Sequence, residues 1–205
     1  MSATPTPELI AKQLSRYAPL KPIINEVGLP PTLRVNPVAK RFPTLVRAIV
    51  YQQLAGKAAA AIHRRLLDGV GGTVEPERFL ALSDDECATF GLSRNKRDSI
   101  RDLAGKTLDG TINVNKHGRM SDEAIVQELV QVRGIGPWTA QMYLMNDLGR
   151  YDVWPTLDYG VRNGWSKIHG HDEMISVKEL VNAADHLTPY RSSVAWYCWQ
   201  AADMK

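Results

Sequence analysis

The segment from Val132 to Met142, VRGIGPWTAQM, places two glycines directly before a proline and a tryptophan. Gly134 and Gly136 permit positive φ and a close approach of the backbone to another molecule. Pro137 suits the first position of a helix, where its missing N–H removes no hydrogen bond. The pattern predicts a tight hairpin between two helices. Its exposed backbone N–H groups and helix N-terminus would suit a phosphate group.

Asp158 lies 20 residues beyond Trp138, after a proline-containing loop and at the start of a predicted helix. An aspartate at such a position is most often a plain N-cap. The same position favours an ionised carboxylate, which a catalytic base or a charge stabiliser would need. Asp158 is therefore a candidate for a capping role, a catalytic role, or both.

Aromatic residues gather near these two features. Trp138 opens the helix after the hairpin, Tyr159 follows Asp158, and Trp196 and Trp199 lie three residues apart on the predicted last helix. Packing in the core is an open alternative for Trp196 and for Trp154. Trp138 lies beside a hairpin and not in the middle of a helix, so a role in binding is favoured there.

The composition fits a globular chain of 205 residues, long enough for one sizeable domain or two small lobes. Hydrophobic residues make up 44% and charged residues 23%, and the net charge of +3 permits nucleic-acid binding without demanding it. Cys87 and Cys198 lie far apart in no metal-binding spacing, which favours a reducing cytoplasm. The N-terminus has no apolar core of a signal peptide, and no apolar run approaches the roughly 20 residues of a membrane span.

Helix signals dominate the chain, and no sustained alternation typical of strands occurs. An apolar stripe runs through residues 44–54, whereas residues 25–43 are interpreted as a proline-broken connection and residues 108–120 as a loop. Helix N-caps are predicted at Thr6, Ser83, Ser93 and Ser176, the second and fourth with the spacing of a capping box. The sequence predicts an all-α fold of roughly ten helices, with boundaries uncertain by about 2–4 residues.

Five segments together resemble AlkA-type DNA-3-methyladenine glycosylases of the helix-hairpin-helix base-excision superfamily. In order, they are LVRAIVYQQLAGKAAAAIHRRL, GLSRNKRDSIRDLA, VRGIGPWTAQMYL, DVWPTLDYGVR and YRSSVAWYCW. The resemblance covers about residues 40–202. It implies one compact unit of two helical lobes with the active site in the cleft between them. Lobe one would span about residues 43–150, and lobe two about residues 1–42 plus 151–205.

The resemblance assigns the catalytic carboxylate to Asp158 and leaves Asp152 a structural role. Relatives that also cleave the DNA strand carry a lysine where this chain has Trp138. The likeness is therefore to the monofunctional branch, which uses water. The family's base pocket corresponds to Trp138, Met142, Tyr159 and Trp199. Met142 replaces a tyrosine of some relatives, and we expect Trp199 to face Asp158 across the cleft.

The remaining roles implied by the resemblance concern DNA binding. The hairpin residues expected to bind a DNA phosphate are Gly134, Ile135, Gly136, Trp138 and Thr139. The main-chain carbonyls expected to hold a monovalent cation, Na⁺ or K⁺, are those of Val130, Val132 and Ile135. The candidates for the wedge that fills the gap of a flipped base are Gln52, Gln53 and Leu54, with a buried core position as the alternative for Leu54. A basic cluster on one helix, either DNA-binding or simply solvated, comprises Arg94, Lys96, Arg97 and Arg101.

The predicted function is excision of alkylated bases such as 3-methyladenine and 7-methylguanine from double-stranded DNA. The alternatives are a glycosylase for deaminated or oxidised bases and a non-catalytic module that binds damaged DNA. Apart from the cation at the hairpin, no cofactor and no iron–sulfur cluster is expected. The chain is expected to be a monomer with no membrane association, located in the cytoplasm, or in the nucleus in a eukaryote.

Overall fold

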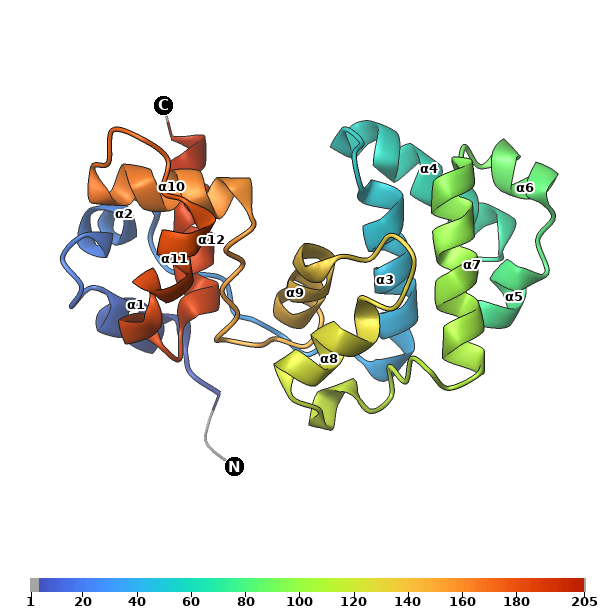
Figure 1. The fold of residues 1–205 in the computed structure, drawn as a ribbon, viewed down its shortest axis with the longest axis horizontal. Helices are drawn as coiled ribbons and strands as arrows, with labels where there is room; N and C mark the ends of the chain where they lie inside the picture. The colour runs from blue at the N-terminus through green and yellow to red at the C-terminus, as the bar shows by residue number, and fades with distance from the viewer. Residues whose placement is uncertain (1–3, 205) are drawn as a thin grey trace. The chain divides into compact units, whose positions relative to one another are not determined.

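The computed structural model describes residues 4–204, and within these it contains twelve α-helices, two short 3-10 helices and no strand (Figure 1). The prediction of an all-α fold is confirmed. The number of helices exceeds the expected ten or so, because two short segments, Leu20–Val27 and Pro76–Leu80, also form helices. The chain divides into two compact units, which are described separately below.

The first unit, here called the hairpin unit, runs from Val35 to Leu148, whereas the sequence analysis began this lobe at about residue 43. Its helices are α3 (Val38–Tyr51), α4 (Gly56–Gly69), α5 (Pro76–Leu80), α6 (Asp84–Thr89), α7 (Arg94–Leu108), η1 (His117–Arg119), α8 (Asp122–Leu129) and α9 (Pro137–Asn146).

Helix α3 forms the centre of the hairpin unit. The four residues of its predicted apolar stripe are fully buried: Leu45, Val46, Ile49 and Val50. The helix packs against α4, α7 and α9 (Figure 1). Burial of this stripe supplies the hydrophobic stabilisation that fixes three neighbouring helices around one axis.

The start of α3 differs from the sequence-based expectation. The helix begins at Val38, inside the segment interpreted as a proline-broken connection, and it contains Pro43. Phe42 is buried, and Arg41 donates from Nη1 to the carbonyl of Val114 at 2.6 Å. These tertiary contacts outweigh the local cost of a proline within the helix.

The second unit, here called the aspartate unit, combines the described residues up to Arg34 with those from Gly149 onward. Its helices are α1 (Pro7–Leu14), α2 (Leu20–Val27), α10 (Tyr159–His169), α11 (Val177–Ala183), η2 (Asp185–Leu187) and α12 (Arg191–Asp203). Helices α10 and α12 pack closely against each other, and α12 also contacts α2.

A glycine permits the close packing of α10 on α12. A Cβ atom at Gly164 would lie 1.8 Å from the carbonyl oxygen of Cys198, so only glycine allows the two backbones to meet there. On the neighbouring face of α12, the buried Tyr197 donates its hydroxyl hydrogen to the carbonyl of Gly28 at 2.9 Å. The last helix is thereby fixed to both α10 and the residue that ends α2.

The four predicted N-caps are confirmed. The hydroxyl groups of Thr6, Ser83, Ser93 and Ser176 each accept a hydrogen bond from the backbone N–H three residues on. Ser83 and Ser176 form complete capping boxes with Glu86 and Glu179. Capping depends on a few adjacent residues, which is why the sequence alone locates these helix starts.

Candidate functional site

The hairpin predicted around the two glycines joins α8 to α9. Gly134 has a φ of +78°, and a Cβ atom there would lie 2.6 Å from Oγ of Ser99 on α7. Gly136 is the N-cap of α9 with an ordinary φ of −98°, and a Cβ atom there would meet nothing within 4 Å. The expectation of a disfavoured φ is thus confirmed at Gly134 and wrong at Gly136.

Carboxylates on α7 hold the hairpin. The backbone N–H of Arg133 donates to Oδ2 of Asp102 at 2.7 Å, and the Arg133 guanidinium lies 3.3 Å from Asp98. Partial burial acts to raise the pKa of Asp102, but hydrogen bonds from Lys106 and from the Arg133 backbone lower it overall. Within the hairpin, the N–H of Ile135 donates to the carbonyl of Val132 at 3.0 Å.

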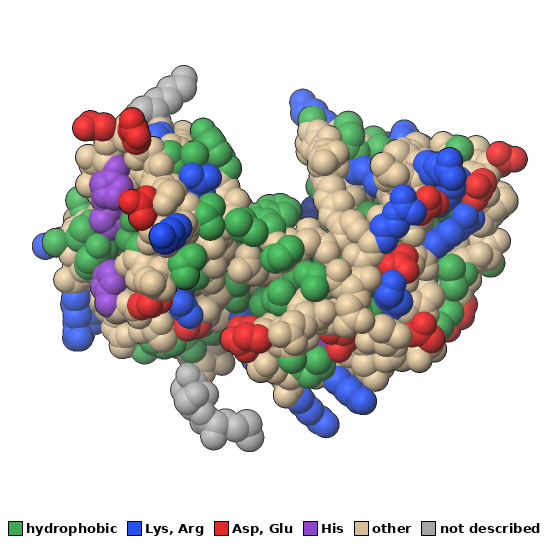
Figure 2. All heavy atoms as spheres, in the orientation of Figure 1, with side chains coloured by type: hydrophobic (Ala, Val, Ile, Leu, Met, Phe, Trp, Pro, Cys, Tyr) green, Lys and Arg blue, Asp and Glu red, His purple; other side chains and the backbone are tan. Residues whose placement is uncertain are grey.

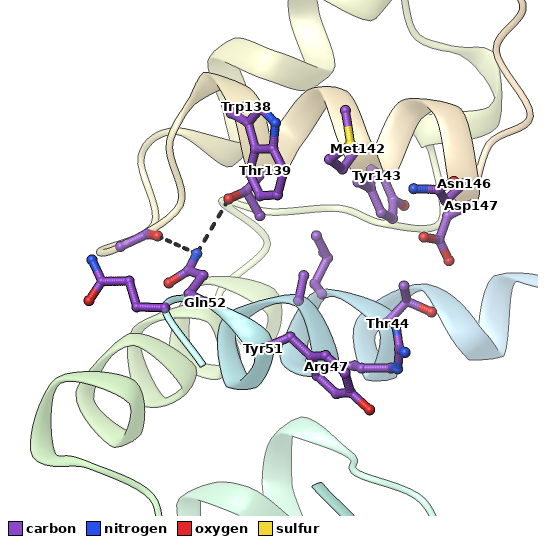
Figure 3. Close-up of a pocket in the computed structure, with 14 residues that line it drawn as sticks. Thr44, Arg47, Tyr51, Gln52, Trp138, Thr139, Met142, Tyr143, Asn146 and Asp147 are labelled. Atoms are coloured by element: carbon purple, nitrogen blue, oxygen red, sulfur yellow. Dashed lines mark hydrogen bonds between the residues drawn. The ribbon is translucent and has the colours of Figure 1, made fainter. Parts of the chain in front are cut away.

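Trp138 and Met142 lie one turn apart on α9 and line a cavity of about 680 Å³ within the hairpin unit (Figure 3). Trp138 is exposed and Met142 half-buried. On the α3 side of the cavity, the guanidinium of Arg47 lies 4.1 Å from the ring centroid of Tyr51, at cation–π distance. The cavity is thus lined by three aromatic rings, those of Tyr51, Trp138 and Tyr143, together with a thioether and a fixed cation.

Asp147 lies at one end of this cavity and is buried (Figure 3). It accepts a hydrogen bond from Asn36 at 3.0 Å. Burial raises the pKa of Asp147, although hydrogen bonds from Asn36 and Thr44 act in the opposite direction. Burial likewise raises the pKa of Tyr143, which favours the neutral phenol over the anion. The sequence analysis identified neither Arg47 nor Asp147.

In the aspartate unit, Asp158 is the N-cap of α10, as predicted. Its Oδ1 atom accepts a hydrogen bond from the backbone N–H of Val161 at 2.8 Å and another from Nε1 of Trp199 at 2.9 Å. The residue is 9% exposed. The carboxylate is therefore fixed in orientation by the start of its own helix and by α12.

Trp199 faces Asp158 as expected, but the two side chains are in direct contact and do not lie on opposite sides of a cleft. Both residues belong to the aspartate unit and are hydrogen-bonded to each other. A Cβ atom at Gly160 would lie 2.8 Å from Cδ1 of Trp199 and 3.2 Å from Oδ1 of Asp158. Gly160 permits this contact, and its only signal in the sequence is its position two residues after the aspartate.

Tyr159 and Asp152 also belong to this unit. Tyr159, the first residue of α10, is 69% exposed, so its ring is available to a ligand. Asp152 accepts hydrogen bonds from the Arg191 guanidinium at 2.8 and 2.9 Å, an ion pair that accounts for its expected structural role.

The three wedge candidates follow α3 in the hairpin unit. Gln52 uses its amide nitrogen to donate to the carbonyl of Gly134 at 2.9 Å and to Oγ1 of Thr139 at 3.3 Å (Figure 3). Gln53 has a φ of +56°, and both Gln53 and Leu54 are exposed. Leu54 is thus not a core residue, and Gln52 is bonded within the protein.

The three arginines of the predicted basic cluster on α7 form ion pairs, although they share two carboxylates and so retain a net positive charge. Arg97 and Arg101 both bind Asp84, at 2.8 and 2.6 Å, and Arg94 lies 3.9 Å from Asp98. Basic and acidic side chains accordingly alternate over this part of the surface (Figure 2). These ion pairs are structural or solvated, and the one lysine of the cluster, Lys96, has different partners that are described below.

Within residues 4–204, neither a cluster of metal ligands nor a membrane-spanning helix is present. No group of three or more His, Cys, Asp and Glu side chains in this range is arranged to hold a metal ion. Likewise, none of the helices in this range has the length and apolar content that crossing a membrane requires.

The hairpin between α8 and α9 places the protein in the class of helix-hairpin-helix proteins, and Asp158 follows it at the start of α10. Residues 46–189 match the model of a specific family, described as the HhH-GPD superfamily of base excision DNA repair proteins. The chain belongs to this superfamily, as the sequence analysis predicted.

Similar proteins agree with this assignment. DNA-3-methyladenine glycosylase 1 of Schizosaccharomyces pombe is 31% identical over 166 residues, covering 80% of this chain and 73% of the relative. The structure of the 3-methyladenine DNA glycosylase of S. pombe in complex with abasic DNA matches with a TM-score of 0.84 and 29% identity, covering 96% of this chain and 99% of that one. A DNA-3-methyladenine glycosidase from Bacillus halodurans matches with a TM-score of 0.85 and 30% identity, covering 98% and 92%.

Proposed function

We propose that the protein is a monofunctional DNA glycosylase that removes alkylated purines of the 3-methyladenine and 7-methylguanine type from double-stranded DNA. Membership of the base-excision superfamily and similarity to glycosylases named for 3-methyladenine support this function. The observation that carries the proposal is the Asp158 carboxylate at the start of α10, fixed by Val161 and Trp199. A protein that only bound DNA would not need such a carboxylate.

The chemistry follows from the charge of the alkylated base. Because alkylation at N3 of adenine or N7 of guanine makes the base cationic, the base leaves without a proton donor. The bond from C1′ to the base nitrogen breaks, and its electron pair goes to the base. The sugar becomes oxocarbenium-like, and the Asp158 carboxylate stabilises this cation. Water then bonds to C1′ through oxygen and loses a proton to the carboxylate, leaving an abasic site.

Binding requires the nucleotide to leave the duplex. We assign stacking on the extruded cationic base to the rings of Trp138, Tyr159 and Trp199, with Met142 as an adaptable contact. The hairpin is assigned to a DNA phosphate through the amides of Gly134, Gly136, Trp138 and Thr139, whereas the Ile135 N–H already donates to the carbonyl of Val132. Of the wedge candidates, the exposed Gln53 and Leu54 fit the role of filling the vacated space better than the internally bonded Gln52.

The hairpin carbonyls of Val130, Val132 and Ile135 are proposed to hold a monovalent cation. The Val132 oxygen already accepts one hydrogen bond, and a carbonyl oxygen has a second lone pair for a cation. The cation would orient the hairpin and take no part in the reaction. We further propose that the protein acts as a monomer, in the cytoplasm or, in a eukaryote, the nucleus.

Replacement of Asp158 by Asn tests the proposal. Asparagine also caps helices, so Asp158→Asn keeps the start of α10 while removing the charge. Single-turnover release of 7-methylguanine should fall by on the order of 10³ or more, while binding to the damaged duplex persists. Asp172→Asn, which neutralises an exposed loop aspartate of the same unit, is the matched control. A near wild-type rate in Asp158→Asn would contradict the assignment.

A second test addresses the absence of strand cleavage. Because Trp138 stands where bifunctional relatives carry a lysine, no amine is available there to attack the sugar. The DNA product should be an intact abasic site, and borohydride should trap no covalent protein–DNA adduct. Electrophoresis under denaturing conditions measures both, and an adduct formed by purified protein excludes the monofunctional assignment.

A panel of duplexes carrying methylated, deaminated and oxidised bases separates this proposal from its alternatives. Preferential release of the cationic methylated bases supports it. Preferential release of hypoxanthine or an oxidised purine favours the second class of glycosylase, and binding without release from any duplex favours a non-catalytic module.

A further inference from the structure

Lys96 differs from the arginines around it. Its ammonium group, at the third position of α7, donates to two backbone carbonyls at the end of α3. One carbonyl belongs to Val50, and the other, at 2.7 Å, belongs to Gln52. The last carbonyls of a helix lack intrahelical partners and carry partial negative charge. A lysine there supplies the missing hydrogen-bond donors and a compensating positive charge. Partial burial lowers the pKa of Lys96, consistent with its position under the turn and not at the surface.

The turn that Lys96 holds contains the exposed wedge candidates. Gln53 is the only non-glycine residue with positive φ in the described part of the chain. A left-handed conformation is disfavoured for glutamine, so surrounding contacts must impose it. The Lys96 bond to the preceding carbonyl, that of Gln52, fixes one side of this strained residue. Ala55 and Gly56 then begin α4, which fixes the other side.

The same turn is bonded to the hairpin. The Gln52 amide reaches both the Gly134 carbonyl and the Thr139 hydroxyl, and Thr139 lies beside Trp138 at the start of α9 (Figure 3). Three residues beyond Lys96 on α7, Ser99 packs directly against Gly134. One face of α7 therefore supports the wedge turn through Lys96 and the hairpin through Ser99, while Gln52 joins the two.

We propose that Lys96 and Gln52 are positioning residues that hold Gln53 and Leu54 in register with the phosphate-binding hairpin, so that the wedge enters the base stack at a fixed distance from the bound phosphate. This inference rests on the proposed function, because it assumes that the turn enters a duplex. Neither residue contacts the reacting atoms in this scheme. Their contribution lies in extruding a paired base, the step that costs least when the base is already unpaired.

The test compares two substrates with each variant. Lys96→Met removes the ammonium but keeps an unbranched side chain, and Gln52→Met removes the amide. Single-turnover release of 7-methylguanine should slow about tenfold or more when the lesion is paired with cytosine, as expected for loss of hydrogen bonds to a charged donor. When the lesion lies in an unpaired bubble, the release rate of each variant should fall by less than about threefold, because little energy is then needed to extrude the base. Lys96→Arg, which retains donors, should recover most of the paired-substrate rate.

Lys57→Met is the matched control, because Lys57 is an exposed lysine of the same unit. A general loss of positive charge slows both substrates alike, and such equal slowing in Lys96→Met would overturn the proposal. Unchanged rates in both Lys96→Met and Gln52→Met would also overturn it. Should Lys96→Met not fold, as judged by circular dichroism, the paired-to-bubble ratio of Gln52→Met decides.

Fluorescence of 2-aminopurine beside an abasic analogue distinguishes failure of this inference from failure of the proposed function. The signal reports unstacking by the wedge whether or not any base is released. If wild-type protein unstacks the probe and Lys96→Met does so less, the inference holds even for a protein without glycosylase activity. Equal unstacking by both proteins refutes it.

Discussion

Two helices of this protein begin in opposite ways. Helix α10 begins with Asp158, whose carboxylate accepts a hydrogen bond from the N–H of Val161 in the first turn. Helix α9 begins with Gly136, an N-cap that has no side chain to accept a capping hydrogen bond, followed by Pro137. Both helix starts carry the partial positive charge of aligned peptide dipoles. One is matched by an anion of the protein itself, and the other suits an anion from outside, so under the proposed function the same electrostatic feature would serve catalysis in one unit and DNA binding in the other.

An aspartate at the start of α9 would make this helix begin as α10 does, and we expect it to weaken the binding of an external anion. Gly136→Asp supplies a favourable N-cap and places a negative charge where we assign a phosphate. The dissociation constant should rise about 10- to 100-fold for damaged and undamaged duplexes alike, because phosphate contacts position the protein without specifying sequence. Thermal stability should not fall.

Gly136→Ala is the control for Gly136→Asp. Gly136 has an ordinary φ and a Cβ atom there meets nothing within 4 Å, so alanine adds bulk without strain or charge. Its effect on binding should stay within about threefold. Fluorescence anisotropy titration measures the binding. Equal affinity of Gly136→Asp and wild type for DNA would contradict the assignment of a phosphate to the start of α9.

Substitutions of Trp199 test the start of α10, because this residue donates a hydrogen bond to Asp158 and is also assigned to stack on the base. Trp199→Ala removes the N–H donor, stacking worth about 1–3 kcal/mol and a cation–π contact worth about 0.5–2 kcal/mol. Release of cationic 7-methylguanine should therefore slow more than release of neutral hypoxanthine, where both are released. Single-turnover rates with excess enzyme measure the difference.

Trp199→Phe separates the two roles of the indole. Phenylalanine retains much of the stacking but has no N–H for Asp158, so it should slow both lesions by a similar, smaller factor. If Trp199→Ala slows both lesions equally, the pocket works by shape and not by charge. If neither lesion is affected, Trp199 only packs in the core.

The smallest effect concerns the capping role of Asp158. Asp158→Ala and Asp158→Asn should lose activity equally, but only the alanine variant loses the cap. Asp158→Ala should be less stable by about 1 kcal/mol in urea unfolding, whereas Asp158→Asn should stay close to wild type. If both variants are equally stable, the hydrogen bond to Val161 contributes little to folding.

The sequence predicted what depends on adjacent residues. The caps at Ser83 and Ser176, the hairpin glycines and the helix start at Asp158 all follow from chemistry within a few positions. The start of α3 did not, since burial of Phe42 and the bond from Arg41 to Val114 extend the helix through Pro43. Local propensity is a weak guide where tertiary contacts decide.

Long-range pairings explain the other differences. Trp199 and Asp158 are separated by 41 positions, and although both were expected in lobe two, nothing near either residue indicates the hydrogen bond between them. Arg97 and Arg101 suggested a freely exposed basic surface, but both form ion pairs with Asp84, on another helix. Lys96 carried no distinct signal in a run of basic residues, because its carbonyl partners at the end of α3 become visible only after the helices pack.

The arrangement of the units along the chain sets an order during synthesis on the ribosome. The hairpin unit is one continuous stretch from Val35 to Leu148, so all its parts have been made before Asp158 is added. The aspartate unit draws on both sides of that stretch, and its catalytic carboxylate receives its indole partner only when α12 emerges. Because domains fold as units during translation, the nascent chain acquires its DNA-binding surface first and its capacity to cut the glycosidic bond last.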